Sequence, residues 1–174
     1  MSRLRATAVL AGFMGLTLPL MPVQAILLRV SRPAARRFPH WYHRNLCRIL
    51  GVRLHIEGQV RRDAPVLLVS NHTSWLDIPV LSAVAPVSFV AKSEVGRWPF
   101  VSALARLQRT VFVDRSRRVA VGETANEMSE RLAQGDALVL FAEGTSTDGN
   151  RVLPFKSSLF AAAKPASPSA ASDA

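Results

Sequence analysis

Hydrophobic residues in the middle of the chain fall into short apolar runs that are separated by segments with helical spacing. This alternation predicts strands and helices that follow one another along the chain. The predicted strands cover residues 52–57, 65–70, 87–91, 110–113 and 137–142. The predicted helices cover residues 74–84, 99–107 and 116–134. We therefore expect an α/β domain around a mostly parallel sheet with flanking helices.

The helix over residues 116–134 has the clearest signals at both ends. Ser116 is a typical N-cap residue, and Gly135 suits the position just beyond the last turn. Its apolar stripe consists of Val121, Ala125, Met128 and Leu132. This spacing predicts one helical face packed on the sheet.

The N-terminal part of the chain is apolar and flanked by arginines. Residues 6–28 carry no charge over 23 positions, enough for a helix to cross ~30 Å of hydrocarbon. Pro19 and Pro22 interrupt this stretch, so a kinked or interfacial helix remains open beside a spanning one. In residues 38–50 aromatic residues alternate with arginines, which suits a lipid headgroup boundary or a packed helix with a solvated basic face.

A secretory signal peptide is the competing interpretation of this stretch, because residues 23–25 loosely resemble a cleavage site. The apolar run continues beyond Ala25, however, and Arg29 and Arg32 follow at once. Arginines directly after an apolar segment favour its retention on the cytoplasmic side. We expect an uncleaved anchor at the inner membrane, with the following domain on the cytoplasmic side.

The formal net charge of +10 is concentrated near the N-terminus. Residues 1–62 hold eleven arginines and one acidic residue, whereas acids and bases balance in the remainder. A basic excess suits an anionic membrane or a nucleic acid. Because this excess flanks an apolar segment, we expect a membrane partner and no nucleic-acid partner.

The chain has a single cysteine, which excludes an intrachain disulfide framework. His40, His43 and Cys47 share one face of a predicted helix and could in principle hold a metal ion. Closed zinc sites use four ligands, however, and no fourth ligand lies nearby. We expect no metal here, but interfacial polar residues and a small buried thiol.

The first segment with candidate chemistry follows the predicted strand 65–70. His72 can act as a general base near neutral pH, and a carboxylate such as Asp77 can orient its ring. The five-residue offset brings the two together only if His72 lies in the turn before the helix, which Pro79 near the helix start also favours. In the alternative, Asp77 caps the helix together with Ser74, and His72 is an ordinary loop histidine.

Further polar residues follow two other predicted strands. Glu143, Gly144 and Thr145 come after the strand 137–142, and Arg115 comes after the strand 110–113. Such residues could hold a polyol or a headgroup, and Lys156 could meet a phosphate. A plain glycine turn and a surface Asp–Arg pair are the alternatives. The sequence contains neither a Gly-x-Ser-x-Gly elbow nor a phosphate-binding loop, so serine hydrolase and NTPase functions lack support.

Taken in order, the Asn-His-x4-Asp box at residue 71, the Phe-Val-Asp-Arg strand at residue 112 and the Phe-x-Glu-Gly-Thr box at residue 141 resemble the glycerolipid acyltransferases. The resemblance covers roughly residues 50–160. It implies transfer of a fatty acyl group from acyl-CoA or acyl carrier protein to a hydroxyl of a lysolipid at a membrane, without a further cofactor. By the same resemblance His72 is the base and Asp77 orients it. The implied substrate-binding residues are Arg115, Glu143, Gly144, Thr145 and Lys156.

Ser146 stands where the family usually has an arginine, a natural partner for the phosphate of lysophosphatidic acid. The run from residue 143 to residue 157 looks closer to the bacterial branch that acylates lyso-ornithine lipid, which carries no phosphate. We divide the chain into a membrane anchor (1–50), an acyltransferase domain (51–163) and a disordered tail (164–174). The family domain normally continues, so we expect the domain to be C-terminally incomplete. A truncated inactive acyltransferase and a non-catalytic basic binding module are the alternative functions.

Overall fold

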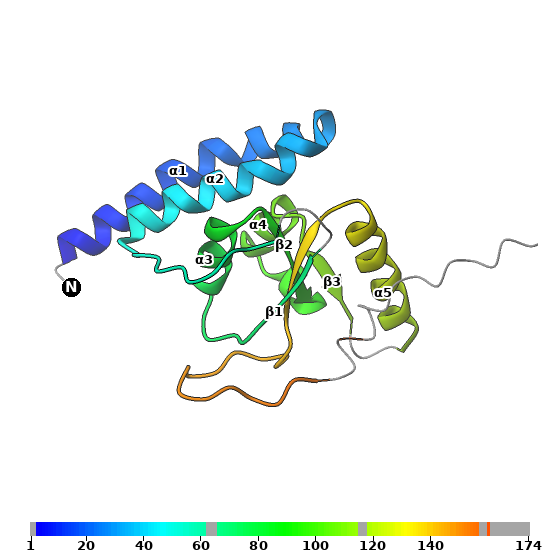
Figure 1. Ribbon diagram of the computed structural model, residues 1–174. Coiled ribbons are helices and arrows are strands. Elements are labelled where there is room, and N and C mark those ends of the chain that lie inside the picture. Colours follow the sequence, from blue (N-terminus) through cyan, green and yellow to red (C-terminus); the bar gives the residue numbers. More distant parts are fainter. Residues whose placement is uncertain (1–2, 62–65, 115–117, 157–159, 161–174) are drawn as a thin grey trace, which may run out of the picture.

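The computed structural model describes residues 3–61, 66–114, 118–156 and 160 (Figure 1). Its helices are α1 (Arg3–Val30), α2 (Arg32–Leu50), α3 (Asp77–Val84), α4 (Val101–Leu107) and α5 (Arg118–Ala133), with a 3₁₀ helix η1 (Ser93–Arg97) before α4. Its strands are β1 (Val66–Ser70), β2 (Val87–Lys92), β3 (Val111–Val113) and β4 (Ala137–Phe141). The predicted N-cap Ser116 lies outside the described residues.

The four strands form one parallel sheet in the order β1-β4-β2-β3. This confirms the α/β fold with a parallel sheet that the alternation of apolar runs predicts. The strand predicted over residues 52–57 is wrong, because this segment is irregular and pairs with none of the described strands. Its apolar alternation does not correspond to burial, since Ile56 is exposed. Alternation alone cannot make a strand where no neighbouring backbone completes the ladder.

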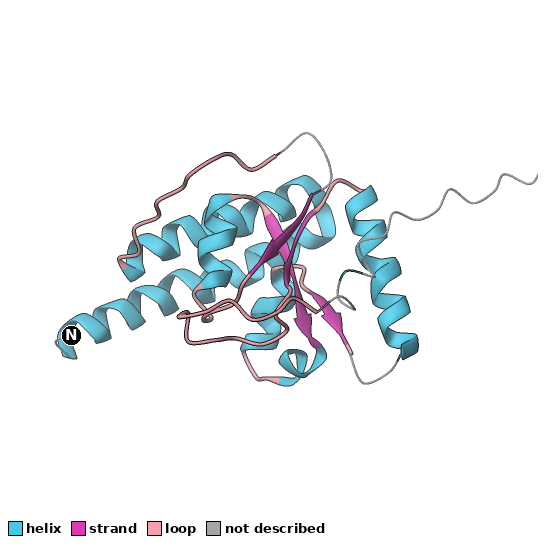
Figure 2. Cartoon of the chain, turned by 60° about the horizontal axis from the view of Figure 1, so that its bottom comes forward, coloured by secondary structure: helices cyan, strands magenta, loops and turns pink. Residues whose placement is uncertain are grey.

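Helices lie on both sides of the sheet (Figure 2), and the interior strand β4 contributes side chains to both faces. Leu138 and Leu140 join a core cluster with Met128 of α5, whereas Val139 and Phe141 join a second cluster on the side of α3. Successive strand residues point to opposite faces, so β4 alternates between these two cores. The apolar stripe predicted for α5 supplies Met128 as the buried residue of its face, with two stripe neighbours packed beside it.

Helix α5 ends at the glycine that the sequence indicates. Gly135 has a φ of +79°, in the left-handed region that favours glycine. Its N–H donates to the carbonyl of Leu132 at 2.8 Å, and the next N–H, of Asp136, donates to the carbonyl of Arg131 at 3.0 Å. These two bonds form a Schellman motif. The motif delivers Asp136 to the start of β4.

Helices α1 and α2 form a long hairpin that lies across one side of the sheet domain (Figure 1). Helix α1 is long and apolar enough to cross a membrane. Two of its polar residues face inward: Thr17 Oγ1 lies 2.7 Å from the hydroxyl of Tyr42, and Gln24 Nε2 donates to the carbonyl of Leu107 at 2.9 Å. Six large apolar residues of α1 are exposed. These are Leu4, Leu10, Leu18, Val23, Ile26 and Val30.

Candidate active site

His72 lies in the turn between the end of β1 and the start of α3. Its Nδ1 is 2.8 Å from Oδ2 of Asp77, the first residue of α3. The two side chains meet because His72 precedes the helix and Asp77 opens it. The structure thus brings the predicted base and its predicted orienting carboxylate together.

The carboxylate of Asp77 also organises the turn that precedes α3. It accepts hydrogen bonds from the backbone N–H groups of Thr73 and Ser74, at 2.7 and 3.0 Å, and from the Thr73 hydroxyl at 3.1 Å. Burial by itself raises the pKa of Asp77, but these bonds and the one from His72 outweigh it and lower the pKa below its ordinary value. Asp77 therefore contacts both the turn before α3 and His72, and its orienting role stays a prediction.

The imidazole of His72 lies flat against the aromatic ring of Phe141 at the end of β4. The ring centroids are 4.1 Å apart and the planes differ by 23°. Because Asp77 accepts the hydrogen on Nδ1, the lone pair of a neutral His72 lies on Nε2. The side chain of His72 is 24% exposed. Nε2 is therefore the nitrogen that can accept a proton from a substrate.

Glu143 follows β4 and is almost completely buried, with 1% of its surface exposed. Its Oε2 accepts the backbone N–H of His72 at 3.0 Å, and its Oε1 accepts the backbone N–H of Leu153 at 2.8 Å. A carboxylate buried to this degree is stable only when its oxygens are hydrogen-bonded. Glu143 therefore ties together three segments at the carboxyl edge of the sheet.

The segment after Glu143 folds back over this edge. The N–H of Thr147 donates to the carbonyl of His72 at 2.8 Å, and the N–H of Lys156 donates to the carbonyl of Ala142 at 2.9 Å. Gly144 is buried in a turn with a φ of +72°, whereas the side chains of Thr145 and Lys156 are exposed. Gly144, Thr145 and Lys156 thus belong to the segment that folds over this edge, and their role in substrate binding stays a prediction. Arg115 lies outside the described residues.

An apolar cavity of about 390 Å³ lies between the hairpin, α3, α4 and the sheet. Trp75 and Ile78 line it, and both flank Asp77 in the sequence. Phe89, beneath Phe141, lines it as well. No pattern in the sequence indicates this cavity, because its walls come from elements that are distant in the sequence and whose apolar residues resemble ordinary core positions.

His40, His43 and Cys47 all face α3. His43 Nδ1 lies 2.9 Å from the hydroxyl of Ser82, and His40 Nδ1 lies 2.7 Å from the carbonyl of the same residue. Burial lowers the pKa of His43 to about 4. Cys47 is buried, and its thiol lies 3.7 Å from the carbonyl of Pro79. Within the described ranges, no three His, Cys, Asp or Glu side chains are grouped as metal ligands.

The chain matches the family model described as acyltransferase over residues 51–171. It is 51% identical over 160 residues to the lyso-ornithine lipid O-acyltransferase of Brucella abortus, with 92% of this chain and 60% of that protein covered. A lyso-ornithine lipid O-acyltransferase of Rhizobium meliloti is 49% identical, with 87% and 52% covered. A 1-acyl-sn-glycerol-3-phosphate acyltransferase of Neisseria gonorrhoeae is 38% identical, with 63% and 45% covered.

The fold is similar to the crystal structure of the 1-acyl-sn-glycerophosphate acyltransferase of Thermotoga maritima. The TM-score is 0.70 at 24% identity, with 92% of this chain and 68% of that chain covered. The chain spans between half and three fifths of the length of its two most similar relatives named above. With the family pattern extending over most of its length, the chain belongs to the acyltransferase family.

Proposed function

We propose that this protein transfers a fatty acyl group from a thioester donor, acyl-CoA or acyl carrier protein, to the hydroxyl of a lysolipid. The observation that carries this proposal is the His72–Asp77 pair at the carboxyl edge of a parallel sheet, with its Nε2 directed away from Asp77. Relatives named for lyso-ornithine lipid and for 1-acyl-sn-glycerol 3-phosphate support the class of reaction.

His72 acts as the general base. Its Nε2 takes the proton of the acceptor hydroxyl while that oxygen forms a bond to the thioester carbonyl carbon. The carbon–sulfur bond then breaks, and the imidazolium returns the proton to the departing thiolate, so that an ester and a thiol are released. Asp77 holds the tautomer and stabilises the imidazolium, because its low pKa keeps it ionised at neutral pH.

Phe141 and Glu143 position the base from β4. The ring of Phe141 supports one face of the imidazole, and Glu143 binds the backbone N–H of His72. Rigid support of this kind keeps a reacting nitrogen in line with its substrate. We assign Glu143 a positioning role, since both of its oxygens are already bound by backbone N–H groups.

The apolar cavity suits a hydrocarbon chain of one of the two substrates. It adjoins the His72–Asp77 turn through Trp75 and Ile78, so a chain seated there would leave its polar end near the base. Burying one CH₂ group contributes about 0.8 kcal/mol, which favours a long acyl chain over a short one.

The hairpin suits a membrane surface. Helix α1 directs Thr17 and Gln24 inward and exposes six large apolar residues, an arrangement that suits contact with lipid. Helix α1 contacts the sheet domain through Phe13, which packs against Phe100, and through Gln24, which donates to the carbonyl of Leu107. These contacts would be lost if α1 crossed the bilayer. We therefore propose that the hairpin lies in the membrane interface, at the cytoplasmic face of the inner membrane.

Lyso-ornithine lipid is the acceptor that we propose in preference to lysophosphatidic acid. Ser146 is exposed after β4 and cannot supply the charge of the arginine usual at this position. A hydrogen bond to a charged group contributes about 1.5–3 kcal/mol. An acceptor without a phosphate does not need that bond, and the two relatives with the higher identities above carry the name of lyso-ornithine lipid.

The test is a competition assay with one acyl donor and both acceptors in the same detergent. We expect a higher kcat/KM for lyso-ornithine lipid, and Ser146→Arg should shift the ratio toward lysophosphatidic acid. A preference of the unaltered chain for lysophosphatidic acid would overturn the acceptor assignment. Transfer to neither acceptor by a folded chain would overturn the activity itself.

A further inference from the structure

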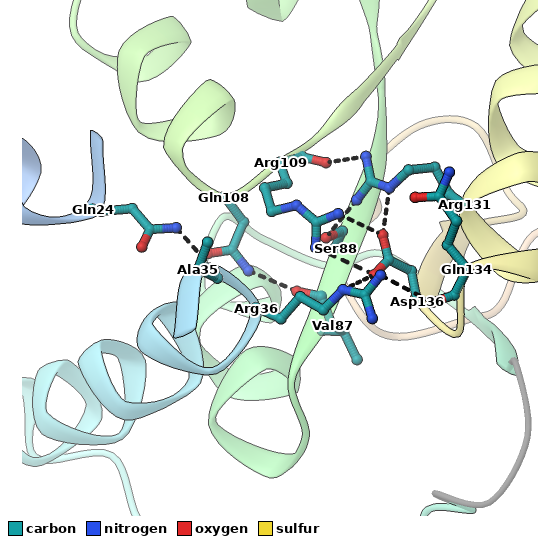
Figure 3. Close-up of polar contacts among 10 residues, drawn as sticks. All are labelled: Gln24, Ala35, Arg36, Val87, Ser88, Gln108, Arg109, Arg131, Gln134 and Asp136. Carbon is teal, nitrogen blue, oxygen red and sulfur yellow. Dashed lines mark hydrogen bonds and ion pairs between the residues drawn. The ribbon is translucent and has the colours of Figure 1, made fainter. Parts of the chain in front are cut away.

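A cluster of arginines surrounds one buried carboxylate at the amino edge of the sheet, opposite His72 (Figure 3). Both oxygens of Asp136 bind the guanidinium of Arg109, at 2.7 and 3.2 Å. Arg131 binds the same carboxylate through Nε, and Arg36 of α2 lies 2.6 Å from its other oxygen. The side chain of Asp136 is 2% exposed.

One carboxylate does not neutralise three guanidinium groups. Burial lowers the pKa of Arg109, and the neighbouring charges of Arg131 and Arg36 lower it further against the attraction of Asp136. Uncompensated charge in a partly buried site is costly unless a counter-ion is present. The cluster therefore leaves an excess of positive charge that an anion would relieve.

A pocket of about 610 Å³ opens beside this cluster. The charged residues that line it are Arg36, Arg37, Arg61, Arg109 and Asp136. Arg36, Arg37 and Arg109 against Asp136 leave two positive charges in excess at the pocket wall. The pocket lies where β2 and β4 begin, since Val87 and Ala137 also line it.

The start of α2 adds to this excess. The first turn of the helix holds no acidic residue, and Arg36 and Arg37 lie within its first two turns. Basic residues near the positive end of a helix dipole are unfavourable by themselves, whereas an anion there is stabilised. The Asp136 cluster and the basic start of α2, which share Arg36, thus face one pocket.

We propose that this pocket binds a phosphate group, from an anionic phospholipid headgroup or from a soluble phosphate. Guanidinium groups match phosphate oxygens with paired hydrogen bonds. Trp41 also lines the pocket and is half exposed, as suits a tryptophan at a lipid headgroup. The site is separate from the acyl-transfer centre, because β4 carries Phe141 beside His72 at its end and Asp136 directly before its start.

The test measures binding to the full chain in a zwitterionic detergent by titration calorimetry. The probes are inorganic phosphate and dihexanoyl phosphatidylglycerol, with dihexanoyl phosphatidylcholine as the control lipid. Arg37→Gln removes a charge from the pocket rim. Arg44→Gln removes the same charge from an exposed position of α2 outside the pocket.

We expect one saturable site, with Kd raised about tenfold by Arg37→Gln and less than about twofold by Arg44→Gln. If the phosphatidylglycerol binds more tightly than inorganic phosphate, the ligand of the pocket is a lipid headgroup. If the two probes bind equally, the ligand is a soluble phosphate. No saturable binding of either probe would overturn the proposal. Equal losses in both variants, or equal binding of the phosphatidylcholine, would do the same, since they indicate general attraction to the hairpin.

Discussion

The buried carboxylate of Glu143 accepts the backbone N–H of His72 at 3.0 Å and so joins the ends of two adjacent parallel strands. The same side chain accepts the N–H of Leu153 through its other oxygen. The sequence pattern suggests that Glu143 contacts substrate, but its carboxylate instead holds the main chain of His72, the proposed base. Mutation of Glu143 is expected to affect geometry before it affects binding.

Replacement of Glu143 by glutamine should weaken this support. The amide oxygen of glutamine can accept one of the two backbone N–H groups, of His72 or of Leu153. The amide NH₂ group then faces the other N–H, and two donors cannot form a hydrogen bond with each other. A buried donor without a partner costs about 1–3 kcal/mol, so we expect a loss of this size in the free energy of unfolding together with a lower kcat. Urea unfolding and acyl-transfer kinetics measure the two effects. Glu127→Gln, at an exposed position of α5, should change neither.

Replacement of His72 by alanine should abolish acyl transfer while the fold is retained. General-base catalysis contributes about 10²–10⁴ in rate, and no substitute nitrogen is supplied by alanine. The measurement is the initial rate of ester formation, with circular dichroism as the check on folding. His55→Ala, at an exposed histidine, serves as the matched control. Retention of more than half of the activity in the His72 variant would exclude the proposed mechanism.

Replacement of Asp77 by asparagine should separate its two roles. The amide oxygen can still accept the N–H of Ser74, whereas the negative charge that stabilises a protonated His72 is lost. We expect kcat to fall by about 10²-fold or more, with a smaller loss of stability. Ser74→Ala should show the opposite pattern, because the Ser74 hydroxyl accepts the N–H of Leu76 and has no contact with His72 among those described. Similar kinetics for the two variants would argue against an orienting role for Asp77.

Stability should decrease in mild acid because of His43. Its pKa is lowered from 6.5 to about 4 in the folded chain, so the unfolded chain binds the proton first as the pH falls. The contribution of His43 to the free energy of unfolding is fully present above about pH 6.5. It is lost as the pH falls from there to about 4, and the total loss is roughly 3 kcal/mol. Urea unfolding at pH 7 and pH 5 tests this. His43→Gln should remove most of the change in the free energy of unfolding between pH 7 and pH 5, whereas His55→Gln should leave this change as it is. If the change persists in the His43→Gln variant, another titratable group causes it.

Local patterns in the sequence were sufficient for the four strands of the sheet and for the approach of His72 to Asp77. Apolar runs identified all four strands of the sheet, because β2, β3 and β4 are largely buried and even the less buried β1 is rich in apolar residues. The approach of His72 to Asp77 was predictable as well, since it depends only on a turn of five residues and the helix start that Pro79 favours.

Only the tertiary structure decided which distant groups complete these elements. Residues 52–57 alternate like a strand but pair with no strand in the described part of the chain, and pairing depends on backbone from elsewhere in the chain. Strand β4 lies between β1 and β2 in the sheet. This position brings the ring of Phe141 against the imidazole of His72, and the carboxylate of Asp136 into contact with Arg36. Hydrogen bonding and burial of a side chain are set by groups far away in sequence. A sequence pattern therefore indicates the type of each residue and its local turn, whereas the folded sheet determines its partners.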